Sequence, residues 1–283
     1  MSSPDLPDLP DLPEVPDFPP NFDELPSASP ERASSGVTSS PGSAPAEPDF
    51  PATTASQTPS RADVPPAETS GKPPQPPPVV LLHGAGQLPT SWQSQVEALG
   101  AERRAMAPWI AGLRPGRRFD LSLKTASAEL INSLDLAGYR TVDVVAHQLG
   151  AMVALQAAAD YPDRIGRLVI SGAMLLPGKL ALRMQKAALR MLPVRGLENT
   201  GLTKDDLIRA LDVMAEADFS SKLSQITAHT LVIVGQSDAS GQLSAKALAG
   251  QLPHGRLEVI PGGAYPPLEN PDAFNRVMVE FLS

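Results

Sequence analysis

The sequence predicts an α/β fold in which a mostly parallel sheet carries helices on both faces. Short, near-continuous apolar runs, typical of strands buried on both faces, alternate along the chain with stretches of helical periodicity. Strands that alternate with helices in this way usually form parallel sheets. A strand, a tight corner and a helix of good helix formers follow one another around 141–159, which indicates where a site would lie.

Composition divides the chain near residue 77. Residues 1–77 hold 20 of the 32 prolines, 12 acidic and 3 basic side chains, so this segment carries a net charge of −9 and the remainder +1. Such a segment buries too little apolar surface to offset its chain entropy. We therefore expect 1–77 to be a disordered acidic Pro-rich tail and 78–283 to form the domain. The near-neutral domain gives no indication of nucleic-acid binding.

An acidic–apolar–proline triplet repeats five times within the tail, from Asp5 to Pro19. Polyproline II has three residues per turn, so the repeat would align an acidic edge beside an apolar edge. Two interpretations remain open. Residues 5–19 are a docking peptide for a protein partner that offers an apolar groove with a basic rim, or they are a solvated spacer.

Targeting signals and cysteines are both missing from the sequence. Residues 2–20 have no basic start followed by an apolar core, and no apolar run is long enough to cross a bilayer. The absence of cysteine excludes disulfides, thiolate metal ligands and a cysteine nucleophile. We expect a cytoplasmic protein with no membrane span, no cofactor and no metal ion.

The elements can be justified in chain order. β-Branched and apolar runs between turn residues predict strands at 79–82, 104–110, 142–145, 167–172, 231–235 and 256–260. Apolar residues at helical spacing predict a helix capped by Thr90 or Ser91, and further helices at 121–136, 149–159, 174–229, 242–251 and 272–282. Residues 67–78 make poor strand, so the sheet is expected to begin late.

The all-helical stretch at about 174–229 interrupts the alternation and is expected to form a helical cap. Within it, Leu180, Met184, Ala187 and Met191 share one side of a helix, and Lys179, Arg183, Lys186 and Arg190 share the other. Three interpretations remain open: a lid over an apolar pocket, a basic face for an anionic surface, or an ordinary helix with a core face and a wet face.

Motifs across residues 78–283 resemble those of the α/β-hydrolase superfamily, in particular its small esterase and haloperoxidase-like members. They are the oxyanion strand at Val80–Gly84, the turn at Tyr161–Ile165, the acid strand and loop at His229–Asp238, and the base loop at Ile260–Pro271. The resemblance implies an α/β-hydrolase fold with a helical cap. It also implies a serine nucleophile, a histidine base, an orienting carboxylate and two backbone amides that bind the oxyanion.

The resemblance assigns these roles residue by residue. The elbow motif G-x-S-x-G is matched by 146–150, which places Gln148 in the nucleophile slot. The base slot holds Ala264 and the acid slot Asp238, while the backbone amides of Ala85 and Leu149 occupy the oxyanion positions. A glutamine amide cannot attack a carbonyl as serine does, and an alanine cannot move a proton.

No other residue is an evident substitute. His83 and His147 match positions that active relatives do not use as the base, His229 lies at the distant end of its strand, and His254 lies in a turn. Tyr265 adjoins the base slot, but neighbouring loop side chains usually diverge. Ser171 and Ser237 could face the site, but neither has an evident base.

The sequence therefore predicts a degenerate Ser–His–Asp triad. The first hypothesis is a non-hydrolytic binding or regulatory protein for a small apolar or carbonyl-bearing molecule. The alternatives are an enzyme with divergent chemistry, such as a lyase, cyclase or isomerase acting on a carbonyl compound, or a weak ester or amide hydrolase. A third hypothesis is an interaction protein recruited through its tail.

Overall fold

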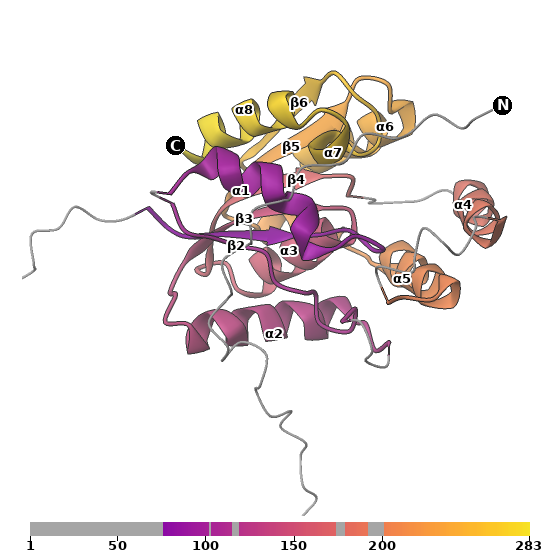
Figure 1. Ribbon diagram of the computed structural model, residues 1–283, viewed down its shortest axis with the longest axis horizontal. Coiled ribbons are helices and arrows are strands. Elements are labelled where there is room, and N and C mark those ends of the chain that lie inside the picture. Colours follow the sequence, from indigo (N-terminus) through magenta and orange to yellow (C-terminus); the bar gives the residue numbers. More distant parts are fainter. Residues whose placement is uncertain (1–75, 102, 115–118, 174–178, 192–200) are drawn as a thin grey trace, which may run out of the picture. The chain divides into compact units, whose positions relative to one another are not determined.

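The computed structural model describes residues 76–283 except 102, 115–118, 174–178 and 192–200 (Figure 1). One compact unit covers Pro74–Ser283. The expectations for the tail, including the triplet repeat at 5–19, lie outside the described residues. So do parts of the predicted cap at 174–229.

Six parallel strands form the sheet, in the order β2-β1-β3-β4-β5-β6. The strands are β1 (Val79–Leu82), β2 (Ala105–Met106), β3 (Val142–His147), β4 (Ile165–Ser171), β5 (His229–Gly235) and β6 (Gly255–Ile260). The predicted parallel sheet is thereby confirmed. The strand expected at 104–110 is only two residues long, because Pro108 cannot donate to the ladder and the chain turns away.

Helices cover both faces of the sheet, as predicted (Figure 1). Alternate residues of each strand point to opposite faces, so Val79 and Leu81 pack in one core and Val80 and Leu82 in the other. The first core is closed by α1 (Gln93–Leu99) and α8 (Pro271–Leu282). The second is closed by α2 (Leu123–Leu136), α3 (Leu149–Asp160) and α6 (Ala239–Gln251).

Several helices differ from the predictions, most clearly at three places. A 3-10 turn, η2 (Pro89–Trp92), precedes α1, so Thr90 and Ser91 lie inside this turn and do not cap the helix. Helix α6 begins three residues early because the Asp238 side chain accepts a hydrogen bond from the Gly241 N–H and caps it. The short helix α7 (Pro266–Glu269) was not predicted, since four residues carry no helical period.

The described part of the cap consists of α4 (Lys179–Met191), α5 (Lys204–Glu216) and the 3-10 turn η5 (Leu223–Gln225). Helix α5 begins with a capping box between Thr203 and Asp206. Helix α4 packs against α5. Lys186 of α4 forms an ion pair with Asp212 of α5 at this contact. Met184 and Met191 are 65% and 86% exposed. The three interpretations of this helix, as a lid, a basic face or an ordinary helix, stay predictions.

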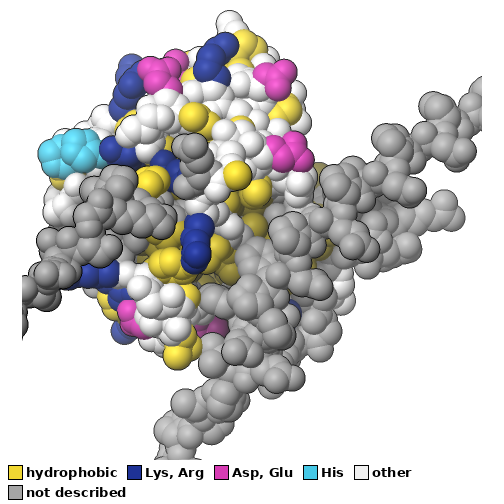
Figure 2. Space-filling view, turned by 60° about the vertical axis from the view of Figure 1, so that its left-hand side comes forward, with side chains coloured by type: hydrophobic (Ala, Val, Ile, Leu, Met, Phe, Trp, Pro, Cys, Tyr) yellow, Lys and Arg dark blue, Asp and Glu magenta, His cyan; other side chains and the backbone are white. Residues whose placement is uncertain are grey.

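The surface of the domain mixes charges of both signs. Lysine and arginine side chains alternate with aspartate and glutamate on the face shown in Figure 2. This distribution agrees with the net charge of +1 calculated for the domain sequence. None of the helices in the described ranges is long and apolar enough to cross a membrane.

Candidate active site at the strand-to-helix corner

Gln148 occupies the corner between the end of β3 and the start of α3. Its backbone adopts φ 48° and ψ −114°, and within the described part of the chain it is the only residue other than glycine with a positive φ. This is the strained turn that a nucleophile elbow requires. The corner is tight because Gly150 has no side chain: a Cβ there would overlap the carbonyl oxygen of Leu82.

The Gln148 side chain lies against the loop that follows β1. A Cβ placed on Gly84 would come within 2.7 Å of the Gln148 Oε1 and 2.8 Å of the Gln87 Oε1. Gln87 is held there because its Oε1 accepts a hydrogen bond of 2.7 Å from the Gly84 N–H. Two carboxamide groups therefore fill the space above this loop.

The two predicted oxyanion donors are Ala85, in the loop after β1, and Leu149, the first residue of α3. Among the described residues, neither backbone N–H donates a hydrogen bond. The neighbouring amides do have partners, since the Gln148 N–H donates to Ser171 and the Gly150 N–H to His83. The Ala85 and Leu149 N–H groups therefore have no hydrogen-bond partner among the described residues, and Leu149 is fully buried.

His147 and Ser171 form a buried pair beside the corner. Their Nδ1 and Oγ atoms are 2.9 Å apart, and both side chains are at most 1% exposed. The expectation that Ser171 lacks a partner base is therefore wrong. The register of the sheet brings them together, because His147 and Ser171 are aligned at the ends of the parallel strands β3 and β4. Ser171 is nevertheless enclosed, so its hydroxyl does not reach solvent.

Burial keeps the His147 ring neutral. It lowers the pKa of His147 from 6.5 to about 4, while the contact with Ser171 acts in the opposite direction. The Nε2 atom of His147 is buried and has no partner among the described residues. Burial also lowers the pKa of His83, whose ring packs edge-on against Trp109 with centroids 5.3 Å apart.

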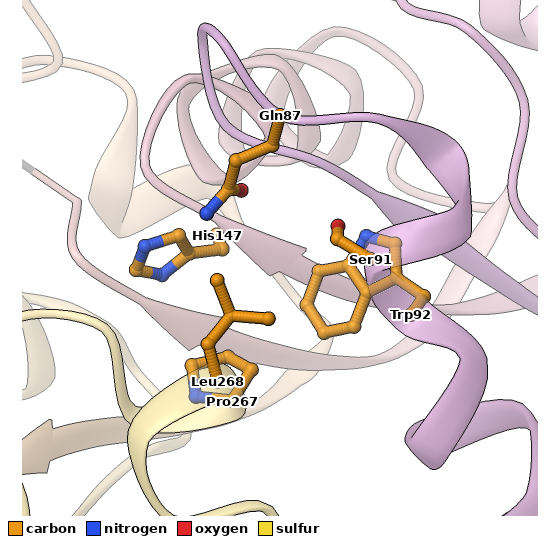
Figure 3. A pocket seen from close by; sticks show the side chains of 6 residues that line it. All are labelled: Gln87, Ser91, Trp92, His147, Pro267 and Leu268. Atoms are coloured by element: carbon orange, nitrogen blue, oxygen red, sulfur yellow. The ribbon is translucent and has the colours of Figure 1, made fainter. Parts of the chain in front are cut away.

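A small cavity opens beside the His147 ring (Figure 3). Its volume is about 10 Å³, which is room for about one water molecule. Pockets that hold small molecules usually have volumes of about 300–1,000 Å³. The side chains that line it come from the loop after β1, the turn η2, the end of β3 and helix α7: Gln87, Ser91, Trp92, His147, Pro267 and Leu268.

The predicted acid and base loops lie side by side. The Ser237 N–H donates to the Gly262 carbonyl at 2.9 Å, and a Cβ on Gly235 would overlap the Gly263 carbonyl oxygen. The Asp238 carboxylate accepts hydrogen bonds from the Gly241 N–H at 2.9 Å and the Ser240 hydroxyl at 3.0 Å. Asp238 therefore has a structural role as the cap of α6.

Ala264 lies exposed in the base loop. The loop keeps its shape because the Glu269 carboxylate accepts hydrogen bonds from the backbone N–H groups of Gly263 and Tyr265. Tyr265 turns back toward the site, with its ring centroid 5.5 Å from that of His147. The sequence predicts that this side chain diverges from the site, because no local pattern indicates its direction, and the structure corrects this prediction.

The cap approaches the site through α5. A Cβ on Gly86 would lie 3.3 Å from the Leu207 Cδ2, so this helix covers the loop that carries Ala85. A second hollow of about 370 Å³ lies elsewhere, between the start of α2 and the end of α5. In the described ranges, no group of His, Asp and Glu side chains is arranged to hold a metal ion.

These groups can polarise a carbonyl but cannot attack it. The Ala85 and Leu149 N–H groups could bind a carbonyl oxygen, and the neutral His147 ring lies nearby. The group at the corner is a glutamine amide, which has no nucleophilic oxygen comparable to a serine alkoxide.

The chain resembles a known protein family and several of its members in sequence. A sequence profile of the alpha/beta hydrolase family matches residues 79–277. A protein of Klebsiella pneumoniae (strain 342), provisionally assigned as the carbamate hydrolase RutD, is 25% identical over 262 residues, covering 79% of this chain and 96% of its own. The 2-hydroxy-6-oxononadienedioate/2-hydroxy-6-oxononatrienedioate hydrolase of Comamonas testosteroni is 23% identical, covering 72% of this chain and 87% of its own.

Solved structures resemble the chain in fold. An esterase from Thermogutta terrifontis, solved with malate bound, has a TM-score of 0.62 at 23% identity, covering 73% of this chain and 89% of its own. An alpha/beta hydrolase family protein from Desulfitobacterium hafniense has a TM-score of 0.63 at 19% identity, covering 74% and 96%. At these identities the likeness concerns the fold.

Proposed function

The chain belongs to the alpha/beta hydrolase family, and from this premise we propose that it is a non-hydrolytic member, a binding or regulatory protein for a small carbonyl-bearing molecule. One observation carries the proposal. Gln148 has the backbone geometry of a nucleophile elbow, but its side chain is an amide. The scaffold that would present a nucleophile thus presents a hydrogen-bonding group.

The base loop supports the same proposal. Ala264 stands in the base slot of a loop whose shape is otherwise kept by Glu269. The Asp238 carboxylate is engaged at the start of α6. A triad without its nucleophile and its base loses several powers of ten in rate. Loss of both groups from intact loops favours a redirected function.

The two free N–H groups support a carbonyl as the recognised group. The Ala85 and Leu149 N–H groups would donate hydrogen bonds to one oxygen atom, and His147 and Trp92 would border the rest of a small ligand. The relatives named above are hydrolases of carbonyl compounds, which favours the same ligand class. Because the cavity is only about 10 Å³, binding requires the Gln148 and Gln87 carboxamides or the cap to move.

The decisive assay is turnover of short- and medium-chain aryl esters by wild type, Gln148→Ala and the matched surface variant Gln93→Ala. We expect no turnover above that of Gln148→Ala, since this chain offers no nucleophile at the corner. Turnover at an ordinary esterase rate would contradict the proposal. Turnover that survives Gln148→Ala would place a nucleophile elsewhere.

Binding of a small carbonyl compound can be measured separately from turnover, by tryptophan fluorescence. In a Trp109→Phe variant, Trp92 is the only tryptophan of the chain, and it borders the cavity. A saturable change of its fluorescence with short alkyl ketones or amides is the expected result, because the indole lies beside the site.

An enzyme with divergent chemistry is the second candidate, and one observation favours it. The neutral His147 ring has an unpartnered Nε2 atom and lines the same cavity as Gln87. In the ester assay, saturable turnover that is lost in Gln148→Ala would favour this candidate, since glutamine would then take part in the reaction.

A further inference from the structure

The hollow of about 370 Å³ between the start of α2 and the end of α5 has the size of a small-molecule pocket. Pockets that hold small molecules usually have volumes of about 300–1,000 Å³. The hollow shares no lining residue with the cavity beside His147. It is therefore a separate candidate site, and its lining indicates which ligand it could take.

Apolar side chains form the floor and one wall of the hollow. Leu121, Leu123 and Phe219 are buried members of the core on this side of the sheet, and they form the floor. Val213 and Ala217 of α5 are partly buried and form the wall. A ligand with an apolar part would cover these side chains and be held by the hydrophobic effect.

The start of α2 contributes positive charge to the hollow. The dipole of a helix places partial positive charge at its N-terminus, where acidic side chains are favourable. The first turn of α2 has no acidic residue, and its second residue is Lys124, which lines the hollow. The N–H groups of Leu123 and Lys124 donate no hydrogen bond within the described ranges. This end of the hollow is suited to a carboxylate.

The end of α5 contributes negative charge. A helix C-terminus carries partial negative charge, where basic side chains are favourable. The last turn of α5 has no basic residue, and its final residue is Glu216. Asp218 follows, and hydrogen bonds from Ser220 lower the pKa of its carboxyl group, so it stays ionised at neutral pH. This end of the hollow is suited to an ammonium group.

These charges oppose the stability of their own helices. Lys124 lies at the positive end of α2 and Glu216 at the negative end of α5, and the helix dipole disfavours both placements. In the part of the chain that the structure describes, no ion pair involves Lys124, Glu216 or Asp218. Neither helix capping nor a neighbouring charge therefore explains why these residues lie here.

Gln156 of α3 adds a largely buried polar group to the lining. It is 7% exposed, and its Nε2 atom donates a hydrogen bond to the Asp160 carboxylate. Its Oε1 atom accepts no hydrogen bond from any described residue. An amide oxygen in a buried side chain gains from a donor, so a ligand N–H group that reached it would be stabilised.

We propose that this hollow binds an apolar α-amino acid in its zwitterionic form. The carboxylate of the ligand lies at the start of α2 beside Lys124, and its ammonium group lies at the end of α5 beside Glu216 and Asp218. The side chain of the ligand covers the apolar floor. A neutral ligand would use neither charged end, and an ion of one sign would use only one of them. The proposal does not depend on the proposed function of the corner site.

Titration of the ¹⁵N-labelled full chain with L-leucine, followed by the shifts of amide signals, tests the proposal. We expect saturable shifts at Lys124, Gln156 and Ala217 and none at Gln148. Two ligands with the same side chain serve as controls: N-acetyl-L-leucine has no ammonium group, and L-leucinamide has no carboxylate. Each should bind about ten-fold more weakly than L-leucine, because each loses hydrogen bonds between charged groups. Glycine, which lacks the apolar side chain, should also bind more weakly.

Variants of the two charged ends separate their roles. Lys124→Gln should bind L-leucine and L-leucinamide equally, because the partner of the carboxylate is removed, and it should still bind N-acetyl-L-leucine more weakly. Glu216→Gln/Asp218→Asn should do the reverse. Neither variant should lower Tm, because the charges at Lys124 and Glu216 oppose their helix dipoles.

Matched controls change exposed charges outside the hollow. They are Lys246→Gln for the basic end and Asp163→Asn/Glu280→Gln for the acidic end. Both controls should keep the full preference for L-leucine over the two other ligands, although they change the net charge as much as the variants of the hollow do.

Four outcomes would overturn the proposal. They are the absence of saturable shifts with L-leucine, shifts centred on Gln148, equal binding of the three ligands by the wild type, and a full preference for L-leucine in both variants of the hollow. Equal binding would mean that only the apolar side chain is recognised. Shifts centred on Gln148 would mean that the ligand binds at the corner.

Discussion

The corner at Gln148 has the backbone geometry of a nucleophile elbow, although its side chain is an amide. A residue other than glycine at positive φ costs about 1–3 kcal/mol, so surrounding contacts must hold it. Here the Gln148 N–H donates to Ser171 at 2.9 Å, its carbonyl accepts from Met152 at 3.1 Å, and the Gly150 N–H donates to His83 at 3.1 Å. These bonds involve the backbone only, so they are indifferent to the side chain at position 148.

His147 provides a prediction at the same scale. Its pKa is about 4 in the folded chain and 6.5 when unfolded, so the unfolded chain binds the proton more readily. The stabilising contribution of neutral His147 is therefore complete above pH 6.5 and is lost as the pH falls toward 4. By pH 5 the loss should amount to about 2 kcal/mol of unfolding free energy.

Urea titrations at pH 7.5 and pH 5 measure this loss. In His147→Gln the difference in unfolding free energy between pH 7.5 and pH 5 should be smaller by about 2 kcal/mol than in the wild type. Equal pH dependence in wild type and His147→Gln would show that burial does not determine the protonation of this ring.

The sequence allowed some site residues to be predicted and not others. The corner at Gln148 follows from a strand, small residues and a helix in immediate succession, all of which are local features. The pairing of His147 with Ser171 depends on strand register, and the direction of Tyr265 depends on a loop held by Glu269. Both are long-range properties that local patterns do not contain.

At the scale of elements, the crossing of β1 and α3 depends on one missing side chain. Gly150 lies where a Cβ would overlap the Leu82 carbonyl, while Gly250, near the end of α6, has nothing within 4 Å. Gly150→Ala should therefore lower the unfolding free energy by about 2–3 kcal/mol. Gly250→Ala should raise it by about 0.5 kcal/mol, since alanine loses less backbone entropy in a helix.

The two alanine variants form a matched pair, because each replaces one helical glycine by the same residue. Denaturant unfolding of both gives the comparison directly. A loss of less than about 0.5 kcal/mol in Gly150→Ala would mean that the corner relaxes at little cost, contrary to the close packing described above.

Helices and strands could be predicted where apolar residues recur at regular spacing. The buried strands and α2 follow from apolar runs and from residues at helical spacing. Helix α4 shows the limit: its period was evident, but the side that faces the protein was not. In the structure Lys186 pairs with Asp212 of α5, while Met184 and Met191 are exposed.

At the scale of the whole molecule, the core described here begins at Val79 and ends at Leu282. Deletion of residues 1–73 should therefore change Tm by less than about 2 °C, because it removes none of these buried side chains. The cut also keeps Pro77 and Pro78, whose carbonyls accept hydrogen bonds from Arg103 and Asp143.

Thermal unfolding followed by circular dichroism measures this change. Deletion of residues 1–82 is the contrasting variant. It also removes β1, which lies between β2 and β3, and should abolish the cooperative transition. A large drop in Tm for the shorter deletion would mean that the N-terminal segment contributes to the stability of the domain.

The overall architecture could be predicted from the sequence, but the length of β2 and the volume of the site cavity could not. The alternation of strands and helices indicates a parallel sheet, and the composition change near residue 77 indicates where the domain begins. The two-residue length of β2 depends on Pro108 and the path of the chain beyond it. The closing of the site cavity to about 10 Å³ depends on side chains from four separate elements.

The two outer strands of the sheet bear on how the protein behaves in concentrated solution. An open strand edge is a template on which another chain can add a strand and start a fibril. One outer strand, β2, offers only Ala105–Met106, and the other, β6, carries the oppositely charged Arg256 and Glu258. Both features make the addition of a further strand unfavourable. We therefore expect the described domain to resist edge-to-edge aggregation.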